Sequence, residues 1–268
     1  MKKLSFIVIL PTLALIMAAC AVSPTGRKQL AFMPESQMAT MGLQSFEQMK
    51  QETLQVKDAA IINYVQCVAD AITRLPEVQA YGSNWEVVVF DEPTVNAFAL
   101  PGSKIGVYKD LLSVAETPDQ LAAVMGHEVG HVLAQHGNER VSQNLAVGQT
   151  LALLENWMAA NNKPYREQAM SLLGVGTQVG ILLPFSRVHE SEADEIGQQL
   201  MAKAGFDPRQ SVTLWQNMSK DGGMAPPEFL STHPAYATRI KQLQAGLAKV
   251  MPYYNAVVNK PLCKAPAL

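Results

Sequence analysis

The stretch PDQLAAVMGHEVGHVLAQHG, residues 118–137, constrains the fold more than any other part of the chain. It has the period of a helix and is apolar on every side, which is typical of a helix at the centre of a domain. Thr117 before Pro118 is a typical helix start, and Gly137 is well placed to end the helix. The side chains in it that are costly to bury are His127, Glu128 and His131.

The spacing of these polar residues predicts a metal site. At about 100° per residue, His127 and His131 lie about 40° apart around the helix axis and about 6 Å apart along it, so their imidazoles can converge. Glu128 lies about 100° from His127 and flanks that point. This is the H-E-x-x-H pattern of zinc peptidases, in which two neutral imidazoles bind Zn²⁺ and the glutamate reaches the water on the metal. His136 lies roughly on the opposite face, where we expect it to cap the helix or face solvent.

A zinc peptidase site needs a third protein ligand, and SRVHESEADEIGQQLMAKAG, residues 186–205, offers one. On a helical wheel, Glu190 and Asp194 are the two carboxylates on the face with small and apolar residues. Because buried carboxylates need a cation or donors, Glu190 is predicted as the third ligand. Asp194 is predicted to hold a ligand histidine in its metal-binding tautomer. The alternative is that both acids pair with Arg187 or another base, and His189, about 100° off that face, is a weaker ligand candidate.

Three segments together resemble the zinc metallopeptidase family of the CAAX prenyl protease and the heat-shock protease HtpX. They are HEVGH at 127–131, SRVHESEAD at 186–194 and STHPAYATRI at 231–240. SPTGRKQL and NAFALPGSKIGVY are similar to the soluble lipoprotein branch represented by LoiP and BepA. The resemblance implies a predominantly helical, zincin-like α+β domain with one Zn²⁺ per chain and a small β-hairpin beside the active-site helix.

The resemblance also implies roles that local spacing does not assign. His233 would assist at the oxyanion or ligate the metal in a resting form, and Arg239 would brace the same segment. The hairpin would hold an extended peptide as an added strand near Asn96, Ala97 and Phe98. Taken alone, STHP is typical of a helix start, and the hairpin could be an ordinary one packed on the core.

The first residues have the organisation of a secretory signal peptide. A basic start and an apolar run to Met17 precede small residues and Cys20. This resembles a bacterial lipobox, with Met17 where Leu is usual, and implies that residues 1–19 are removed and that Cys20 carries lipid. Plain secretion or an uncleaved anchor is the alternative. Ala21 after the cysteine favours the outer membrane, facing the periplasm of the bacterial cell envelope.

The two remaining cysteines, Cys67 and Cys263, form an even pair in an oxidising compartment. This predicts a disulfide that joins an early helix to the C-terminal tail. The alternative for Cys67 is a small buried residue within the apolar pattern of its helix.

The rest of the chain is predicted mostly as helix. Clear strand patterns occur only at 84–90 and 104–108. Helices are expected over 36–49, 58–75, 145–157, 168–183, 188–204, 208–218 and 235–250. Without an internal repeat or a linker, residues 20–268 are predicted as a single zinc metallopeptidase domain with a tail from about 251 to 268.

Composition limits the partners of the chain. The 268 residues have a formal net charge of -2 and a sequence pI of about 6.2, so no basic surface for nucleic acid is expected. The longest apolar stretch after the signal, SLLGVGTQVGILLPF, is short and rich in glycine. It is predicted as a core helix, with membrane or substrate contact as the alternative. The predicted partners are a protein or peptide substrate and, through Cys20, a membrane.

These residues predict a zinc-dependent endopeptidase. Glu128 would take the proton of the attacking water and pass it to the leaving amine, and His233 would stabilise the tetrahedral oxygen. By resemblance, misfolded or unassembled envelope proteins would be the substrates. One alternative is an outer-membrane assembly or chaperone-like factor with a latent zinc site capped by His233. The other is a structural zinc, which is disfavoured because structural sites are usually closed by four ligands and rich in cysteine.

Overall fold

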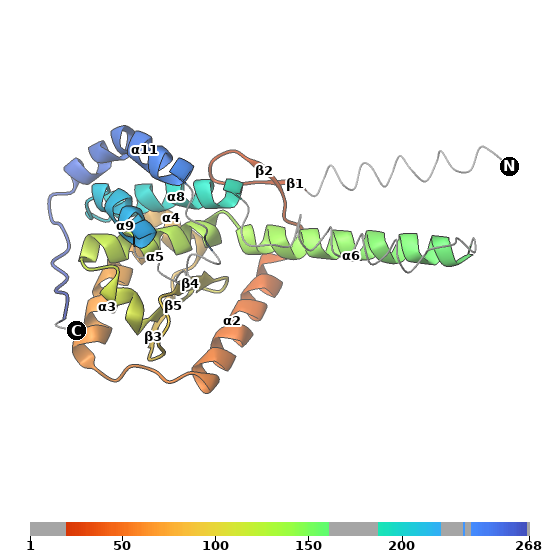
Figure 1. The fold of residues 1–268 in the computed structure, drawn as a ribbon, viewed down its shortest axis with the longest axis horizontal. Helices are drawn as coiled ribbons and strands as arrows, with labels where there is room; N and C mark the ends of the chain where they lie inside the picture. The colour runs from red at the N-terminus through yellow and green to blue at the C-terminus, as the bar shows by residue number, and fades with distance from the viewer. Residues whose placement is uncertain (1–19, 161–186, 221–232, 234–236, 267–268) are drawn as a thin grey trace. The chain divides into compact units, whose positions relative to one another are not determined.

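The computed structural model describes residues 20–160, 187–220, 233 and 237–266 (Figure 1). These residues belong to two compact units, a smaller one with residues 20–34 and 135–160 and a larger one with the others. The predicted signal peptide, the predicted helix at 168–183 and most of the STHPAYATRI segment before Ala237 lie outside the described residues. The single domain over 20–268 therefore stays a prediction.

The larger unit is mainly helical with one small sheet, which confirms the predicted α+β class. Among its described residues the helices are α2 (Glu35–Glu52), α3 (Ala59–Thr73), α4 (Pro76–Tyr81), α5 (Pro118–Leu133), α8 (Arg187–Lys203), α9 (Arg209–Lys220) and α11 (Ala237–Ala256). A 3₁₀ helix, η1 (Lys109–Ser113), precedes α5. The tail begins later than predicted, because α11 continues to Ala256 although Pro252 lies inside it. None of the helices in the described ranges is long and apolar enough to cross a membrane.

The sheet of the larger unit has the strand order β3 (Glu86–Phe90), β5 (Lys104–Tyr108) and β4 (Ala97–Leu100). β3 runs parallel to β5, and β4 runs antiparallel to β5 as the first strand of a β4–β5 hairpin. The hairpin turn contains Gly102 and Ser103, both with positive φ. In the described part of the chain β4 is an edge strand. Its four residues lack the β-branched side chains that made the other two strands recognisable in the sequence.

Helix α5 lies at the centre of the larger unit, as its apolar character predicted. Every residue from Gln120 to Val132 is buried, and the Thr117 side chain accepts a hydrogen bond from the Gln120 backbone N–H at the helix start. The predicted helix end at Gly137 is wrong. The helix stops at Leu133 because Gln135 adopts a left-handed conformation, with φ of 54°, and the chain then enters the next helix.

The smaller unit joins a two-stranded sheet to one long helix. β1 (Cys20–Val22) pairs antiparallel with β2 (Lys28–Leu30), and β2 packs on α6 (His136–Ala160). Arg27 is held by both carboxylate oxygens of Glu139, with N–O distances of 3.1 and 2.7 Å. Helix α6 begins at His136, well before the predicted residue 145. The His136 side chain is fully buried, so the expectation that it faces solvent is wrong.

Helices α5 and α8 cross at unusually short range, and this crossing sets the geometry of the site. A Cβ atom added to Gly197 of α8 would lie 2.6 Å from the backbone nitrogen of His127 and 2.7 Å from the carbonyl carbon of Gly126. A Cβ atom added to Gly130 would lie 2.9 Å from the carbonyl oxygen of Ala193. Only glycine allows the two backbones to approach so closely.

Replacing Gly197 by alanine is expected to push α5 and α8 apart. The free energy of unfolding should fall by about 1–3 kcal/mol, as for other overpacked cores, and zinc affinity should fall with it. Chemical denaturation and a chelator competition would measure the two effects. Gly148→Ala in α6 is the matched control, because a Cβ atom there would meet nothing within 4 Å. An unchanged zinc affinity in Gly197→Ala would show that the crossing distance does not control the site.

A disulfide joins Cys67 of α3 to Cys263 in the C-terminal tail, with the two Cα atoms 5.7 Å apart. The two residues are 196 positions apart in the sequence, so the bond closes a very long loop. It anchors the segment after α11 to the hydrophobic core of the larger unit, where Cys263 is buried.

Removing this disulfide in the double variant Cys67→Ala and Cys263→Ala is expected to be strongly destabilising. For a closed loop of 196 residues the chain-entropy relation gives about 5 kcal/mol, as an upper estimate. Denaturant unfolding of the variant and of the oxidised wild type would measure the difference. A loss below about 1 kcal/mol would mean that the unfolded chain gains little freedom, contrary to the relation.

Candidate metal centre

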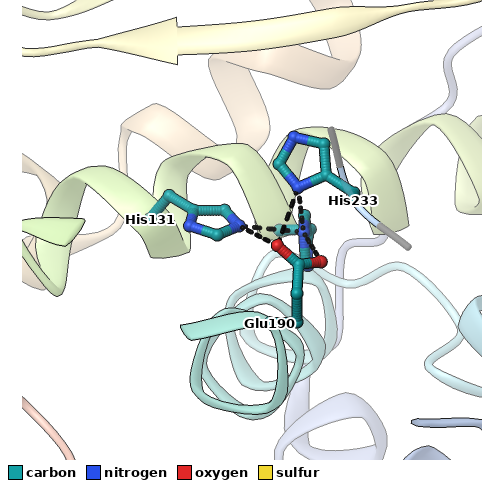
Figure 2. Close-up of side chains that lie close together, drawn as sticks. His131, Glu190 and His233 are labelled. Atoms are coloured by element: carbon teal, nitrogen blue, oxygen red, sulfur yellow. Dashed lines mark hydrogen bonds and ion pairs between the residues drawn. The ribbon is translucent and has the colours of Figure 1, made fainter. Parts of the chain in front are cut away.

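Four buried side chains from three parts of the larger unit converge on one point (Figure 2). His127 and His131 come from successive turns of α5, Glu190 comes from the first turn of α8, and His233 precedes α11. Each offers one ligand atom, and these atoms all lie within 4.8 Å of one another. The structure thus brings the three predicted ligands and the predicted oxyanion or ligand histidine together. Their roles toward a metal stay predictions.

The distances among these ligand atoms suit a metal ion better than hydrogen bonds alone. His127 Nε2 lies 3.0 Å from His131 Nε2 and 3.3 Å from His233 Nδ1. Glu190 Oε1 lies 3.4 Å from His131 Nε2. Four atoms placed tetrahedrally about 2.0–2.1 Å from zinc are roughly 3.3 Å apart, which is close to these separations. Imidazole and carboxylate are also the donors that zinc prefers.

Asp194 lies behind His127, where the sequence predicted an orienting acceptor. Its Oδ1 is 3.0 Å from His127 Nδ1, so the opposite ring nitrogen, Nε2, faces the centre. This arrangement favours the tautomer that carries its proton on Nδ1 and leaves Nε2 free as a ligand. The alternative was that both acids pair with Arg187 or another base, and the structure shows such a base in Arg239, which contacts both of them.

Protonation states in the metal-free chain follow from burial and from these contacts. Burial lowers the pKa of His127, but its hydrogen bonds to the carboxylates of Asp194 and Glu190 outweigh burial and raise the pKa to about 9. Burial dominates at His131 and lowers its pKa well below the usual value. At Glu190 burial raises the pKa, but hydrogen bonds to His127, His131 and His233 outweigh it and hold the pKa far below its usual range. Glu190 is therefore ionised and His131 neutral, as ligands must be.

Glu128 flanks the four converging side chains. Its Oε1 is buried, has no hydrogen-bond partner among the residues that the structure describes, and lies 3.5 Å from His233 Nε2. The backbone N–H of Ala99 in β4 donates to the Glu128 carboxylate, which ties the strand to the centre. Burial raises the pKa of Glu128 above its ordinary value. A carboxylate of this kind accepts a proton readily.

The edge of β4 turns part of its backbone toward α5. The Tyr108 N–H donates to the Asn96 carbonyl, so the backbone of Asn96 faces β5. In an antiparallel pair, every second residue turns its N–H and C=O groups away from the partner strand. On β4 these residues are Ala97 and Ala99. The outward-pointing backbone groups therefore belong to Ala97 and Ala99 rather than to the predicted Phe98, whose side chain stacks over Gly106 among aromatic rings. The Ala97 N–H is itself held by the Asn96 side chain.

Two groups at the site were not found from the sequence. The Trp215 ring, from α9, lies 3.8 Å from the Arg239 guanidinium carbon, and its centroid is 6.1 Å from that of His127. Its position on the buried face of α9 is equally typical of an ordinary core residue. The contact of the Ala99 N–H with Glu128 could not be predicted, because nothing in the sequence shows which edge of a strand lacks a neighbouring strand. The weaker ligand candidate His189 is buried but lies outside the converging group.

Residues 56–246, which contain the whole of this site, match the family model described as Peptidase family M48. The chain belongs to peptidase family M48. Peptidases of family M48 use zinc, in agreement with the donor set described above. The prediction of a zinc metallopeptidase family is therefore confirmed, while the lipoprotein branch within it stays a prediction.

Curated relatives of this M48 chain come from mitochondria and from bacteria. Mitochondrial metalloendopeptidase OMA1 of Arabidopsis thaliana is 40% identical over 163 residues, which are 60% of this chain and 31% of the relative. Metalloendopeptidase OMA1, mitochondrial, of Homo sapiens is 28% identical over 273 residues, 92% of this chain and 48% of the relative. The β-barrel assembly-enhancing protease of Yersinia pestis is 24% identical over 225 residues, 82% of this chain and 46% of the relative. The chain thus spans half or less of each of these proteins.

Proposed function

We propose that this chain is a zinc-dependent endopeptidase that cleaves extended segments of protein substrates. The observation that supports this best is the convergence of His127, His131 and Glu190 on one point, with the buried carboxylate of Glu128 beside it. A purely structural zinc site would need neither a buried acid at the ligand cluster nor an edge strand beside it. Family membership supports the same reaction class.

Each residue of the site has its own proposed role in the reaction. His127, His131 and Glu190 would hold Zn²⁺, which when bound polarises the scissile carbonyl and acidifies water. Glu128 accepts the proton of the attacking water and returns it to the leaving amine, a role that suits its raised pKa. Asp194 keeps His127 in the ligand tautomer. His233 Nε2, 3.5 Å from Glu128, can donate to the oxygen on which negative charge develops.

The edge strand β4 supports an extended protein segment as the substrate. The outward C=O groups of Ala97 and Ala99 can accept hydrogen bonds from a peptide that adds as a further strand. The N–H groups of these two residues already donate to the Asn96 side chain and to Glu128. Such pairing reads the main chain and ignores most side chains. It requires the substrate to be locally unfolded, which fits misfolded or unassembled proteins.

We place this activity in the bacterial cell envelope, with lipid on Cys20 and the protein held at the outer membrane facing the periplasm. The lipobox-like start supports an anchor after removal of residues 1–19. The disulfide between Cys67 and Cys263 supports an oxidising compartment. The bacterial relative is named for β-barrel assembly, which supports envelope proteins as substrates.

The proposed activity is tested on purified chain 20–268. Elemental analysis should give about one zinc per chain, and the protein should cleave reduced, alkylated casein. Removal of zinc by a chelator should abolish cleavage, and added Zn²⁺ should restore it. A chain that holds no zinc, or that holds zinc and cleaves no unfolded protein, would contradict the proposal.

A second candidate function is an assembly or chaperone-like factor with a latent site. His233 Nδ1 lies 3.3 Å from His127 Nε2 and 3.0 Å from Glu190 Oε1, where it could fill the fourth position on the metal. If it caps the site, His233→Ala should cleave casein faster than the wild type. If His233 assists the reaction, the same variant should be slower.

A further inference from the structure

Arg239 of α11 carries a positive charge that is almost completely enclosed within the site. It is 1% exposed, although arginine is almost never fully buried unless it is paired. Its partners include Asp194, Glu190, the His233 carbonyl and the Trp215 ring, which belong to the site. A residue that served only to attach α11 would not need to contact this many groups around the ligands.

The guanidinium is held in one orientation. Nε and Nη2 donate to the two carboxylate oxygens of Asp194, each at 2.7 Å, and the face of the group lies 3.8 Å from the centre of the Trp215 ring. Nη1 donates to the His233 carbonyl at 3.3 Å. This two-pronged geometry is specific to arginine, since an ammonium group cannot make it.

The fixed orientation places positive charge against one oxygen of the third ligand. Arg239 Nη1 lies 2.7 Å from Glu190 Oε2, which is farther, 3.5 Å, from the predicted ligand atom His127 Nε2. The other oxygen, Oε1, faces His131 Nε2 at 3.4 Å and His233 Nδ1 at 3.0 Å. A divalent ion bound to both oxygens would lie within a few ångströms of the guanidinium in a dry interior. That repulsion is weaker when the ion binds Oε1 alone, because the ion then lies farther from the guanidinium.

We propose that Arg239 is a positioning residue that restricts Glu190 to a single metal-binding oxygen and so keeps one coordination position open. This inference rests on the proposed zinc site. The open position matters because a catalytic zinc holds three protein ligands and leaves the fourth place for water or substrate. A carboxylate that binds through both oxygens would occupy space that the water and the scissile carbonyl need.

The test uses Co²⁺ in place of zinc, because its visible absorption distinguishes four-coordinate from five-coordinate sites. The Co²⁺-loaded wild type is expected to give the intense absorption of a four-coordinate site. Arg239→Gln, which removes the charge, should weaken this absorption several-fold as Glu190 binds through both oxygens. Arg239→Lys keeps a cation and should restore part of it. Arg209→Gln is the matched control, an exposed arginine of α9 that pairs with Asp207.

The outcomes separate a positioning role from a structural one. If Arg239 only stabilises the fold, Arg239→Gln should melt earlier while its folded fraction keeps the wild-type Co²⁺ spectrum, and the inference is then wrong. If Arg239→Gln does not fold, X-ray absorption spectroscopy of the zinc-loaded wild type tests the inference instead, because it shows how many carboxylate oxygens are bonded to zinc. One carboxylate oxygen at about 2.0–2.2 Å supports the inference, and two bonded oxygens overturn it. A wild type that binds no metal would instead refute the proposed function itself.

Discussion

Glu128→Gln is expected to retain full zinc content and to cleave an unfolded substrate about 10²–10⁴-fold more slowly than the wild type. Glutamine keeps the shape of the side chain but cannot accept the proton of the attacking water. The zinc ligands are untouched, because Glu128 points beside the converging atoms and is not one of them. The Ala99 N–H can still donate to the amide oxygen, so the fold of the strand should persist.

Three measurements check this prediction: elemental zinc, initial rates on reduced, alkylated casein, and thermal unfolding with zinc bound. Glu116→Gln is the matched control, an exposed glutamate just before α5. Its rate and zinc content should equal those of the wild type. Cleavage by Glu128→Gln within threefold of the wild-type rate would remove Glu128 from the mechanism and leave the latent-site function as the better account.

Glu190→Gln is expected to lower zinc affinity by more than the 10–100-fold that loss of a supporting partner costs. The amide has no charge to offer the cation, and the two histidines of α5 alone make a weak site. The variant also removes the negative charge that pairs with Arg239. The buried guanidinium is then only partly neutralised, so the metal-free protein should become less stable. Cleavage should be lost together with zinc.

Zinc dissociation constants from chelator competition, with denaturant unfolding of the metal-free proteins, measure both effects. Glu195→Gln lies on the same helix, and the wild-type Glu195 carboxylate is largely exposed, 3.5 Å from Lys249. It should leave zinc affinity and stability near the wild-type values. Wild-type zinc affinity in Glu190→Gln would mean that another residue is the third ligand.

Much of the site could be predicted because its determinants are local. The i, i+4 spacing of His127 and His131 fixes their common face on any helix, and the surrounding apolar residues show that this face is buried. The same periodicity places Glu190 and Asp194 on one face of α8. The start of α5 was predictable too, since Thr117 caps the N–H of a residue three positions along the chain.

Other features depend on contacts between residues far apart in the sequence. Arg239 looked like a brace of its own segment, but its distance to Glu190 exists only because α11 packs on α8. β4 lacks β-branched side chains, and its role as an edge comes from pairing with β5 alone. The close approach of Gly126 and Gly197 follows from the helix crossing and not from either glycine by itself.

The sequence by itself determined the ligand types, their spacing and the helices that carry them, because these follow from bonds and dihedral angles within a few residues. Only the tertiary structure decided how the helices cross, which edge of the sheet faces Glu128 and which oxygen of Glu190 faces Arg239. Those choices depend on packing between elements that are distant along the chain, where small changes in side-chain volume shift whole helices. A local sequence pattern contains no information about the distances between elements that are far apart in the chain.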